Sequence, residues 1–442
     1  MKFKSFNGGV HPKDSKEYSK SSAIEVMDIP KKVVIPLSQH IGAPANPIVK
    51  PGDRVKTGQL IAEPSAFVSL AMHSSVTGKV TKIAMNPHPG GFSSMAIEIE
   101  TEEQDEWVEL IDDANYLDLS AEEIKLRIGN AGICGMGGAG FPTLIKLSPP
   151  ADKPIDTVIL NGVECEPYLT SDYRNMLERP KDIIAGLKII MKTLSAKQGY
   201  IGIEANKLDA IKLMTDLTKN DKDIYVVPLK LKYPQGAEKQ LIYACTKRKV
   251  PNKGGLPSSV EVVVQNVGTA IAIYEAVRYK KPLIERVITV SGRIVKNPKN
   301  IQARVGTAFS ELVEKCGGTT EEIGKIISGG PMMGFALPDL DAPVCKTSSG
   351  LLLFNQKEAR SLEEHACLRC GRCVDACPLN LLPSFIASAV KYKDWDMAEK
   401  SGVMDCMKCG SCSYVCPAHI KIIQWVDIGK NQITAMRRTA KS

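Results

Sequence analysis

Cys367-x-x-Cys370-x-x-Cys373-x-x-x-Cys377-Pro378 is repeated farther along the chain as Cys406-x-x-Cys409-x-x-Cys412-x-x-x-Cys416-Pro417. These two runs hold eight of the 13 cysteines, and the others are scattered: Cys134, Cys165, Cys245, Cys316 and Cys345. Crowding of this kind indicates metal centres and not a disulfide framework. We assign no catalytic role to the scattered five, because a lone cysteine usually behaves as a small buried apolar residue.

The spacing of each run is typical of bacterial ferredoxins that hold two [4Fe–4S] clusters. Two-residue gaps let one tight loop bring three thiolates around a cluster, while the cysteine before proline points to the other cluster. One predicted ligand set is therefore Cys367, Cys370, Cys373 and Cys416, and the second is Cys406, Cys409, Cys412 and Cys377. Zinc sites also use C-x-x-C pairs, but zinc explains neither the third cysteine step nor the prolines.

The segment between the two runs has a helical pattern of apolar residues. We expect one helix face to carry Phe385, Ile386, Ala389 and Val390, with Asp394-Trp395-Asp396 opening the next helix. Residues 360–430 are therefore predicted to form an α-helical ferredoxin-like domain with two clusters.

Upstream, a glycine-rich stretch, Gly135-Met136-Gly137-Gly138-Ala139-Gly140, formally satisfies G-x-G-x-x-G. A helical pattern precedes it and prolines follow it, so we do not expect a standard Rossmann unit. Such a loop still lets its backbone approach a phosphate or a ring and offers several amide donors. The alternative is a purely structural turn.

A strand over 156–160 leads into Asn161-Gly162-Val163-Glu164-Cys165-Glu166-Pro167. This places carboxylates at the edge of a parallel sheet where ligands bind, so the sequence favours a nucleotide or flavin site over surface glutamates. Further strands at 199–204 and 224–229 alternate with helices at 181–195, 206–219 and 269–279, which predicts a parallel sheet with helices on its faces.

The flanking regions have other patterns. Residues 30–84 contain short strands, and 98–123 are acidic and poor in periodicity up to a capping box at Ser120 and Glu123, so we place a domain boundary there. Residues 285–355 combine short strands with one helix near 307–315 and read as a small α+β module.

Composition bounds the function. A chain of 442 residues with 43% hydrophobic content builds several domains. The net charge of +8 is spread along the chain without a nucleic-acid motif, so no nucleic-acid partner is expected. No apolar run approaches the roughly 18 residues of a membrane span, and the start lacks an apolar signal region, so we expect a cytoplasmic protein that meets a membrane only through partners.

The early strands resemble lipoyl and biotinyl carrier domains through Val49–Ile61 and His73–Val80. The stretch 63–67 offers no lysine to carry a swinging arm, so we expect an unmodified packing module.

The later motifs resemble the FMN- and NADH-binding subunit of respiratory complex I: Gly135–Thr143 with Lys146, Asn161–Pro167, Tyr233–Glu238 and Val264–Val267. Together with Asn7–Pro12, Ile35–Pro44 and the cysteine runs, they narrow the resemblance to the RnfC subunit of the Rnf complex, a ferredoxin:NAD oxidoreductase coupled to ion translocation. The resemblance implies a multi-domain α/β and α+β chain. Its expected domains are a lipoyl-like β-sandwich over 1–110, a complex I-like α/β flavin and NADH domain over 115–282, a β-grasp module over 285–355, and the ferredoxin domain over 360–430.

The resemblance also implies non-covalent FMN and a set of binding residues. Gly135, Gly137 and Gly138 are expected at the flavin, Lys146 at a phosphate, and Asn161, Val163 and Glu164 along the ring. Phe141 and Glu166 are expected to hold NADH, and the pocket is completed by Tyr233, Glu238, Gln265 and Asn266. Met136 replaces the usual arginine and Ala237 a glutamate, which puts the phosphate contacts in question.

The implied activity is exchange of hydride between NAD(H) and FMN and of single electrons with the two clusters. The implied partners are other Rnf subunits, including the iron–sulfur subunit that takes electrons from ferredoxin, at the cytoplasmic face of the membrane. Two alternatives remain open: a corrin (cobalamin) reductase of a bacterial microcompartment, and a non-enzymatic iron–sulfur relay.

Overall fold

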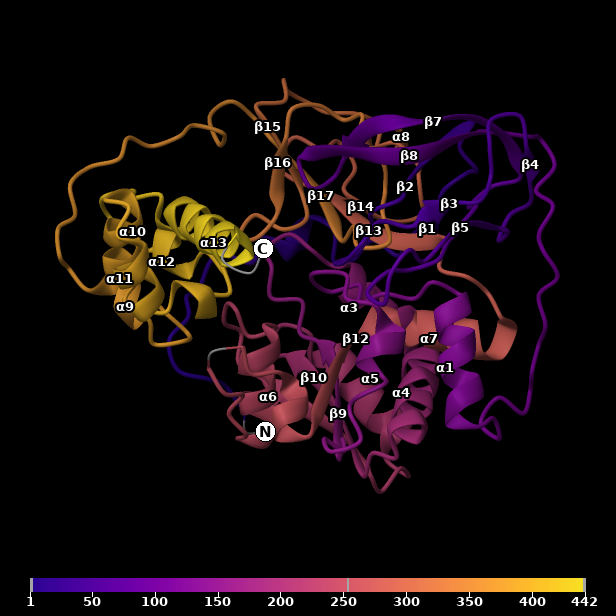
Figure 1. The fold of residues 1–442 in the computed structure, drawn as a ribbon, viewed down its shortest axis with the longest axis horizontal. Coiled ribbons are helices and arrows are strands. Elements are labelled where there is room, and N and C mark those ends of the chain that lie inside the picture. The colour runs from indigo at the N-terminus through magenta and orange to yellow at the C-terminus, as the bar shows by residue number, and fades with distance from the viewer. Residues whose placement is uncertain (1–2, 253, 440–442) are drawn as a thin grey trace.

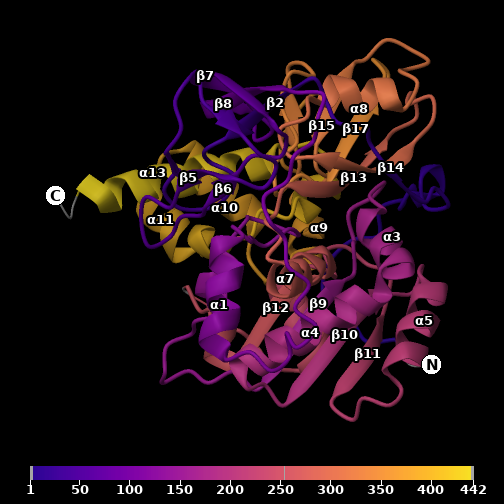
Figure 2. The same ribbon diagram turned by 90° about the vertical axis from the view of Figure 1, so that its right-hand side faces the viewer.

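The computed structural model describes residues 3–252 and 254–439. Figure 1 shows a helical unit in orange and yellow on one side, a parallel-sheet unit below, and two β-rich units above it. Figure 2, turned by 90°, shows both β-rich units again above the parallel sheet. The chain therefore builds four structural units that share interfaces.

The parallel-sheet domain contains a four-stranded sheet in the order β11-β10-β9-β12. All three strand pairs are parallel, as predicted. Its strands are β9 (Thr157–Gly162), β10 (Gln198–Glu204), β11 (Ile224–Leu229) and β12 (Val262–Asn266). Its helices are α1 (Ala121–Asn130), α2 (Thr143–Lys146), α3 (Ser171–Glu178), α4 (Pro180–Leu194), α5 (Leu208–Thr218), α6 (Glu238–Thr246), the 3₁₀ turn η2 (Pro257–Val260) and α7 (Val267–Tyr279).

Helices cover both faces of this sheet because its strands are apolar on both sides. Val158 and Leu160 pack under α4 and α7, whereas Ile159, between them, packs with α6. The N-cap half of the predicted capping box is confirmed, since the Ser120 side chain accepts a hydrogen bond from the Glu123 amide at 3.2 Å at the start of α1. The Glu123 carboxylate accepts from Arg127 Nε at 2.8 Å.

The N-terminal β-sandwich has a four-stranded sheet, β2-β8-β7-β4, and a three-stranded sheet, β3-β5-β6. The strands are β2 (Lys32–Pro36), β3 (Asn46–Pro47), β4 (Arg54–Val55), β5 (Leu60–Glu63), β6 (Met72–His73), β7 (Gly78–His88) and β8 (Phe92–Thr101). We expected residues 98–123 to lack a regular pattern, and this was wrong for residues 98–101. Strand β8 continues to Thr101 because Ile97 and Ile99 are fully buried and hold it to the core.

The α+β module is a six-stranded sheet in the order β1-β14-β13-β17-β15-β16, covered by one helix. The elements are β1 (Ile24–Val26), β13 (Glu285–Ser291), β14 (Lys299–Arg304), α8 (Phe309–Lys315), β15 (Lys325–Ser328), β16 (Phe335–Leu337) and β17 (Gly350–Phe354). Strand β1 comes from the start of the chain and pairs with β14, so it lies in this sheet and not in the sandwich.

The C-terminal unit is helical, as expected. It contains α9 (Arg372–Asp375), α10 (Pro383–Lys391), α11 (Trp395–Lys400), the 3₁₀ turn η3 (Val403–Asp405), α12 (Ser411–Tyr414) and α13 (Ile422–Thr439). Ile386, Ala389 and Val390 are buried, but Phe385 is 48% exposed, so its placement on the same face was wrong. Position 385 turns outward because the buried stripe of α10 follows residues 386, 389 and 390.

The N-terminal segment runs between units before entering the sandwich, and its own short helix is the 3₁₀ turn η1 (Lys16–Tyr18). Lys4 bridges to Leu229 and Val10 to Tyr233 in the parallel-sheet domain. Gly9 donates to the Ala376 carbonyl of the helical unit at 2.9 Å. In the described part of the chain, every helix is too short or too polar to cross a bilayer.

Candidate functional site

The glycine loop joins the end of α1 to α2 and is closed on itself, since the Gly135 amide donates to the Phe141 carbonyl at 2.9 Å. Gly137, Gly138 and Ala139 are exposed at its tip. A Cβ built on Gly138 has no heavy atom within 4 Å, so the loop presents bare backbone to open space. Such a tip suits the close approach of a phosphate or a planar ring.

Met136 stands in the loop where the resemblance leads us to expect an arginine. Its side chain is buried, so nothing at this position reaches a ligand phosphate. Its backbone is held instead: the amide donates to Thr269 Oγ1 at 2.9 Å, and the carbonyl accepts from Arg286 Nη2 at 3.1 Å. Arg286 is fully buried and comes from β13 of the α+β module, so two domains shape the loop; no local pattern in the chain indicates this contact.

The loop meets the edge of the sheet where β9 and β12 end side by side, with Asn161 opposite Asn266. A Cβ on Gly137 would lie 2.9 Å from the Asn266 side chain. Asn266 caps α7 by accepting from the Gly268 amide at 2.7 Å, and Asn161 donates to the Gly236 carbonyl at 2.8 Å. The structure thus brings together the glycine loop, the strand ends and the segment after Tyr233.

Three other predicted residues lie near the same edge: Lys146, Glu238 and Gln265. Lys146 at the end of α2 pairs with Glu238 at the start of α6 at 2.8 Å. Gln265 in β12 is buried, and within the described residues its side-chain nitrogen has no hydrogen-bond partner. An unsatisfied buried donor, bare glycine backbone and a nearby ammonium group form a donor set that fits an anionic, hydrogen-bonding cofactor such as FMN.

Glu164 has a structural role that the sequence did not suggest. Its carboxylate accepts from the Asp172 amide at 2.7 Å and the Tyr173 amide at 3.3 Å, so it caps the start of α3. The side chain is almost fully buried, and the residue has a positive φ of 50°. Both carboxylate oxygens are engaged in this cap, so the side chain is not free to contact a ligand.

Glu166 lies at the junction with the α+β module. Its Oε2 accepts from the Met332 amide at 3.0 Å, and its Oε1 lies 3.5 Å from the Tyr233 hydroxyl. Burial raises the pKa of Glu166 to about 7, against the lowering effect of the Met332 amide and Lys16. Phe141, predicted to stack on NADH, sits at the end of the glycine loop and is 37% exposed.

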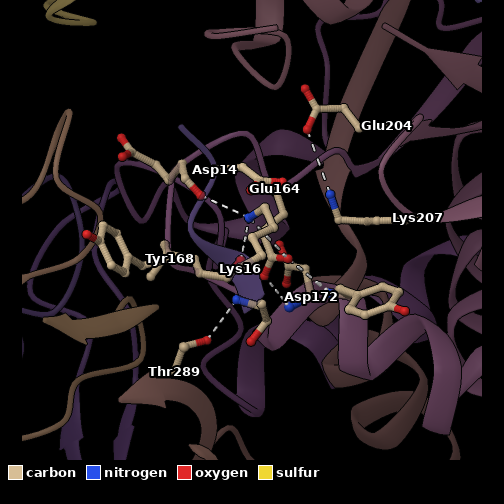
Figure 3. Close-up of polar contacts among 12 residues, drawn as sticks. Asp14, Lys16, Glu164, Tyr168, Asp172, Glu204, Lys207 and Thr289 are labelled. Carbon is tan, nitrogen blue, oxygen red and sulfur yellow. Dashed lines mark hydrogen bonds and ion pairs between the residues drawn. The ribbon is translucent and has the colours of Figure 1, made fainter. Parts of the chain in front are cut away.

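Two buried lysines donate hydrogen bonds to the backbone of residues 163–169, the edge segment that follows β9. The sequence analysis identified neither of them. Lys16 donates to the carbonyls of Glu166 at 3.0 Å and Leu169 at 2.5 Å, and Lys207 donates to the Val163 carbonyl at 2.8 Å. Figure 3 shows Lys207 pointing toward Glu204. Their ammonium groups lie within 4 Å of Glu164 and Glu204 respectively, which balances the buried charge. In sequence they resemble ordinary surface lysines.

Asp172 completes this buried polar group (Figure 3). Its carboxylate accepts a hydrogen bond from the side-chain Nδ2 of Asn266 at 2.6 Å. Burial, reinforced by the nearby Glu164 carboxylate, raises the pKa of Asp172 to about 7, whereas Arg286 opposes this shift. The acids and the cations around the edge segment therefore form one connected electrostatic network.

One of the two predicted cluster ligand sets lines a single cavity in the helical unit, between the loops and α13. We call this set the inner cysteines: Cys377, Cys406, Cys409 and Cys412. The cavity is walled by apolar groups including Leu381, Ile386 and Val426. Four thiols around one enclosed apolar space form a donor set that fits a [4Fe–4S] cluster.

The backbone repeats itself around both runs. Arg369 and Lys408 have φ of 55° and 57°, and Gly371 and Gly410 have φ of 75° and 79°. In both runs the amide two residues after the first cysteine points to that sulfur, from Arg369 to Cys367 and from Lys408 to Cys406, at 3.4 Å each. Amides directed at sulfur are a common feature of iron–sulfur sites.

The other ligand set, the outer cysteines, is more open: Cys367, Cys370, Cys373 and Cys416. Cys367 and Cys370 are exposed and precede α9 in a stretch without regular structure. Of the five scattered thiols, Cys134, Cys245, Cys316 and Cys345 are buried, as expected, and Cys165 is half-buried. Burial raises the pKa of Cys134 and Cys165, which keeps these thiols protonated.

Family models match four parts of the chain. They are an RnfC barrel sandwich hybrid domain over residues 4–104, a Nuo51 FMN-binding domain over 128–275, an SLBB domain over 287–336 and a 4Fe-4S dicluster domain over 360–417. Each range falls inside one of the four predicted domains. The matches and the described architecture confirm the predicted fold class.

Curated relatives match nearly the whole of this chain. The chain is 51% identical to the C-subunit of the proton-translocating ferredoxin:NAD⁺ oxidoreductase complex of Clostridium ljungdahlii, covering 99% of this chain and 96% of the relative. It is 44% identical to the C-subunit of the Na⁺-translocating ferredoxin:NAD⁺ oxidoreductase complex of Acetobacterium woodii, covering 99% of each. It is 40% identical to the C-subunit of the ion-translocating oxidoreductase complex of Rhodobacter capsulatus, covering 97% and 83%.

Solved structures extend the likeness in fold. A chain of an NAD⁺-reducing [NiFe]-hydrogenase in the air-oxidised state matches with a TM-score of 0.52 at 16% identity, over 71% of this chain and 66% of that one. The H₂-reduced form matches with a TM-score of 0.50, also at 16% identity, over 74% and 68%. At this identity the likeness concerns the fold alone.

Proposed function

The chain belongs to the RnfC family, the C-subunits of ion-translocating ferredoxin:NAD⁺ oxidoreductase complexes, and on that basis we propose that it exchanges electrons with NAD(H) through FMN and two [4Fe–4S] clusters. It acts within a multi-subunit complex. One observation carries the proposal: Tyr233, whose segment meets the strand ends at the glycine loop, donates through its hydroxyl to the carbonyl of Cys409 at 2.8 Å. The parallel-sheet domain, at whose edge we propose that FMN binds, is thus in direct contact with the inner cysteines.

The residues that would hold FMN are those at the sheet edge. Gly137 and Gly138 offer close backbone approach, Lys146 a positive charge, and Gln265 an unsatisfied donor. Asn161 and the backbone of Val163 and Glu164 line the same edge, with Gly135, Glu238 and Asn266 fixing its shape. When bound, FMN converts between a two-electron hydride and single electrons, and each cluster holds one of those electrons.

Phe141 and Glu166 are the proposed NADH contacts. Phe141 offers an exposed ring for stacking beside the glycine loop. Glu166 offers a carboxyl group whose pKa burial raises to about 7. The family resemblance supports both roles. A nucleotide bound at Glu166 would also border the α+β module, because the Glu166 carboxylate accepts from the Met332 amide.

The inner cysteines are proposed to bind the cluster nearer the flavin, because they contact the parallel-sheet domain through Tyr233. The outer cysteines are proposed to bind the second cluster. Their exposure suits electron exchange with a partner subunit, for which we propose the iron–sulfur subunit that takes electrons from ferredoxin, at the cytoplasmic face of the membrane.

The corrin-reductase alternative is not favoured, because the relatives described above, which match nearly the whole of this chain, are ferredoxin:NAD⁺ or ion-translocating oxidoreductase subunits. The relay alternative makes a different experimental prediction. A relay would bind iron but neither FMN nor NADH.

The test uses the full chain, reconstituted without oxygen with iron, sulfide and FMN. We expect about eight irons and one FMN per chain, and NADH oxidation with an artificial acceptor such as ferricyanide. Glu166→Gln should weaken NADH turnover and leave the iron content unchanged. Binding of iron without FMN, together with no NADH oxidation, would exclude the proposed function and support a relay.

A further inference from the structure

The start of the chain contains the motif Asn7-Gly8-Gly9-Val10-His11-Pro12, for which the proposed function gives no role. In the structure this segment lies between the parallel-sheet domain and the inner cysteines; in Figure 1 the indigo start of the chain follows this path. Val10 and Tyr233 exchange two backbone hydrogen bonds, of 2.8 and 2.9 Å. On its other side, the Gly9 amide donates to the Ala376 carbonyl at 2.9 Å, next to Cys377.

Both glycines have left-handed backbones, with φ of 76° at Gly8 and 79° at Gly9. A Cβ on Gly8 would lie 2.7 Å from the Cys377 carbonyl oxygen, and a Cβ on Gly9 would lie 2.5 Å from the Tyr233 carbonyl oxygen. Real Cβ atoms do not approach backbone oxygens so closely, and side-chain-bearing residues rarely adopt this φ. Two independent constraints therefore require glycine at both positions.

Within the described residues, three hydrogen-bonded contacts reach the inner cysteines or their chain neighbours from outside the helical unit, and the turn makes one of them. The Tyr233 hydroxyl donates to the Cys409 carbonyl at 2.8 Å, and Gln240 Nε2 donates to the Pro378 carbonyl at 3.1 Å. Val10, Tyr233, Ala376 and Cys409 also form one buried apolar cluster. Of these three contacts, the Gly8–Gly9 turn is the one that places backbone directly against Cys377, the ligand that crosses from the first cysteine run.

We propose that the Gly8–Gly9 turn is a positioning element that fixes the Cys377 side of the inner cluster site against the flavin-binding domain. The proposal rests on the proposed function, since it concerns the same electron path. A side chain at Gly8 pushes the backbone of Cys377 away from the parallel-sheet domain. The electron path between the flavin edge and the inner site then lengthens, while the flavin edge itself, on the far side of Tyr233, keeps its own contacts.

The test compares Gly8→Ala with Gly318→Ala in the full reconstituted chain. Gly318 is a matched control because its φ is 81° and a Cβ there has no heavy atom within 4 Å, so it carries the same backbone cost without the clash. Rapid mixing with NADH follows flavin reduction and cluster reduction separately. Redox titration monitored by EPR gives the potential of each cluster.

In Gly8→Ala we expect flavin reduction to match that of the parent and cluster reduction to slow severalfold, because the rate of electron transfer falls steeply as the distance between two redox centres grows. The EPR spectrum of one cluster should change and that of the other should not. In the cluster-free, flavin-free chain, hydrogen exchange should rise in the peptide that contains Ala376 and Cys377. Gly318→Ala should show none of these changes.

Equal cluster reduction and equal exchange in the two variants would overturn the proposal. Loss of flavin and iron together in Gly8→Ala would also overturn it, because the turn would then be a general folding element. Failure of the parent chain to bind FMN or to pass electrons from NADH to the clusters is a different result. It would refute the proposed function itself, while the exchange measurement would still report on the contact with Cys377.

Discussion

The hydroxyl of Tyr233 donates a hydrogen bond to the backbone carbonyl of Cys409 at 2.8 Å, across the boundary between the parallel-sheet domain and the helical unit. Burial raises the pKa of Tyr233, so the hydroxyl stays protonated and remains a donor. The carboxyl of Glu166 lies beside the same hydroxyl. One side chain thus connects Glu166, a proposed NADH contact, to the inner cysteines.

Tyr233→Phe should remove this connection with little change in shape. Because the Cys409 carbonyl loses a donor in a buried place, we expect a loss of about 1–2 kcal/mol in the free energy of unfolding. NADH-driven cluster reduction should slow more than flavin reduction does. Tyr225→Phe is the control, since that tyrosine is 44% exposed. Equal denaturation midpoints for the two variants would contradict the assigned role of the hydroxyl.

Glu166→Gln should change how stability depends on pH. The folded-state pKa is raised from 4.5 to about 7, so the folded protein binds this proton more tightly than the unfolded chain does. The resulting stabilisation is fully present below about pH 4.5 and is lost as pH rises through about 7. Glutamine does not titrate, so the melting temperature of the variant should improve relative to the parent as pH rises through this window. A constant difference across that range would refute the shift.

Lys16→Met should loosen the edge segment after β9. The substitution removes the donor to Glu166 and Leu169 and leaves the buried Glu164 without its nearby cation. We expect a loss of about 3 kcal/mol or more in stability, together with weaker FMN binding. Lys13→Met is the control, because Lys13 is exposed and forms its ion pair with the exposed Glu17. Thermal unfolding and FMN titration would show whether the two lysines differ.

Gly138→Ala should affect the cofactor and not the fold. A Cβ at this position meets no protein atom, so stability should stay within about 0.5 kcal/mol of the parent. If FMN lies on the loop tip, the same Cβ meets the flavin, and affinity should fall about tenfold or more. Gly137→Ala is the informative partner, because its Cβ would clash with Asn266 and destabilise the chain even without FMN. Unchanged flavin affinity in Gly138→Ala would show that the flavin does not lie against the loop tip.

Pairs of cysteine substitutions distinguish crossed from uncrossed cluster ligation. In the crossed arrangement Cys377 and Cys412 belong to one cluster, so the double serine variant should keep about four irons. Cys373 and Cys377 belong to different clusters, so their double variant should lose nearly all iron. The uncrossed arrangement predicts the reverse for both pairs: loss of nearly all iron for Cys377 with Cys412, and about four irons kept for Cys373 with Cys377. Iron analysis with EPR of the reduced protein decides between them.

Part of the molecule could be predicted because its signals are local. The two-two-three spacing of the cysteines indicates clusters whatever the rest of the chain does, since a short loop alone brings such thiols together. Ser120 and Glu123 predict the start of α1, and the alternating strands and helices predict the parallel sheet. Misses such as Phe385 arise where two adjacent apolar residues compete for one helix face and packing selects between them.

The order of residues dictates which chemical groups are present and which of them stand close along the chain: the thiols, the glycine loop and the acids after β9. Which charged side chains become buried, and so lose contact with solvent, depends on tertiary packing. In the packed chain, Lys16 and Lys207 are buried and donate hydrogen bonds to backbone carbonyls. Packing also buries the Met136 side chain and places Gly8 against the Cys377 backbone. Contacts between residues 150 or more positions apart leave no local pattern, because their energy comes from burial and complementary shape, which exist only once the domains have packed.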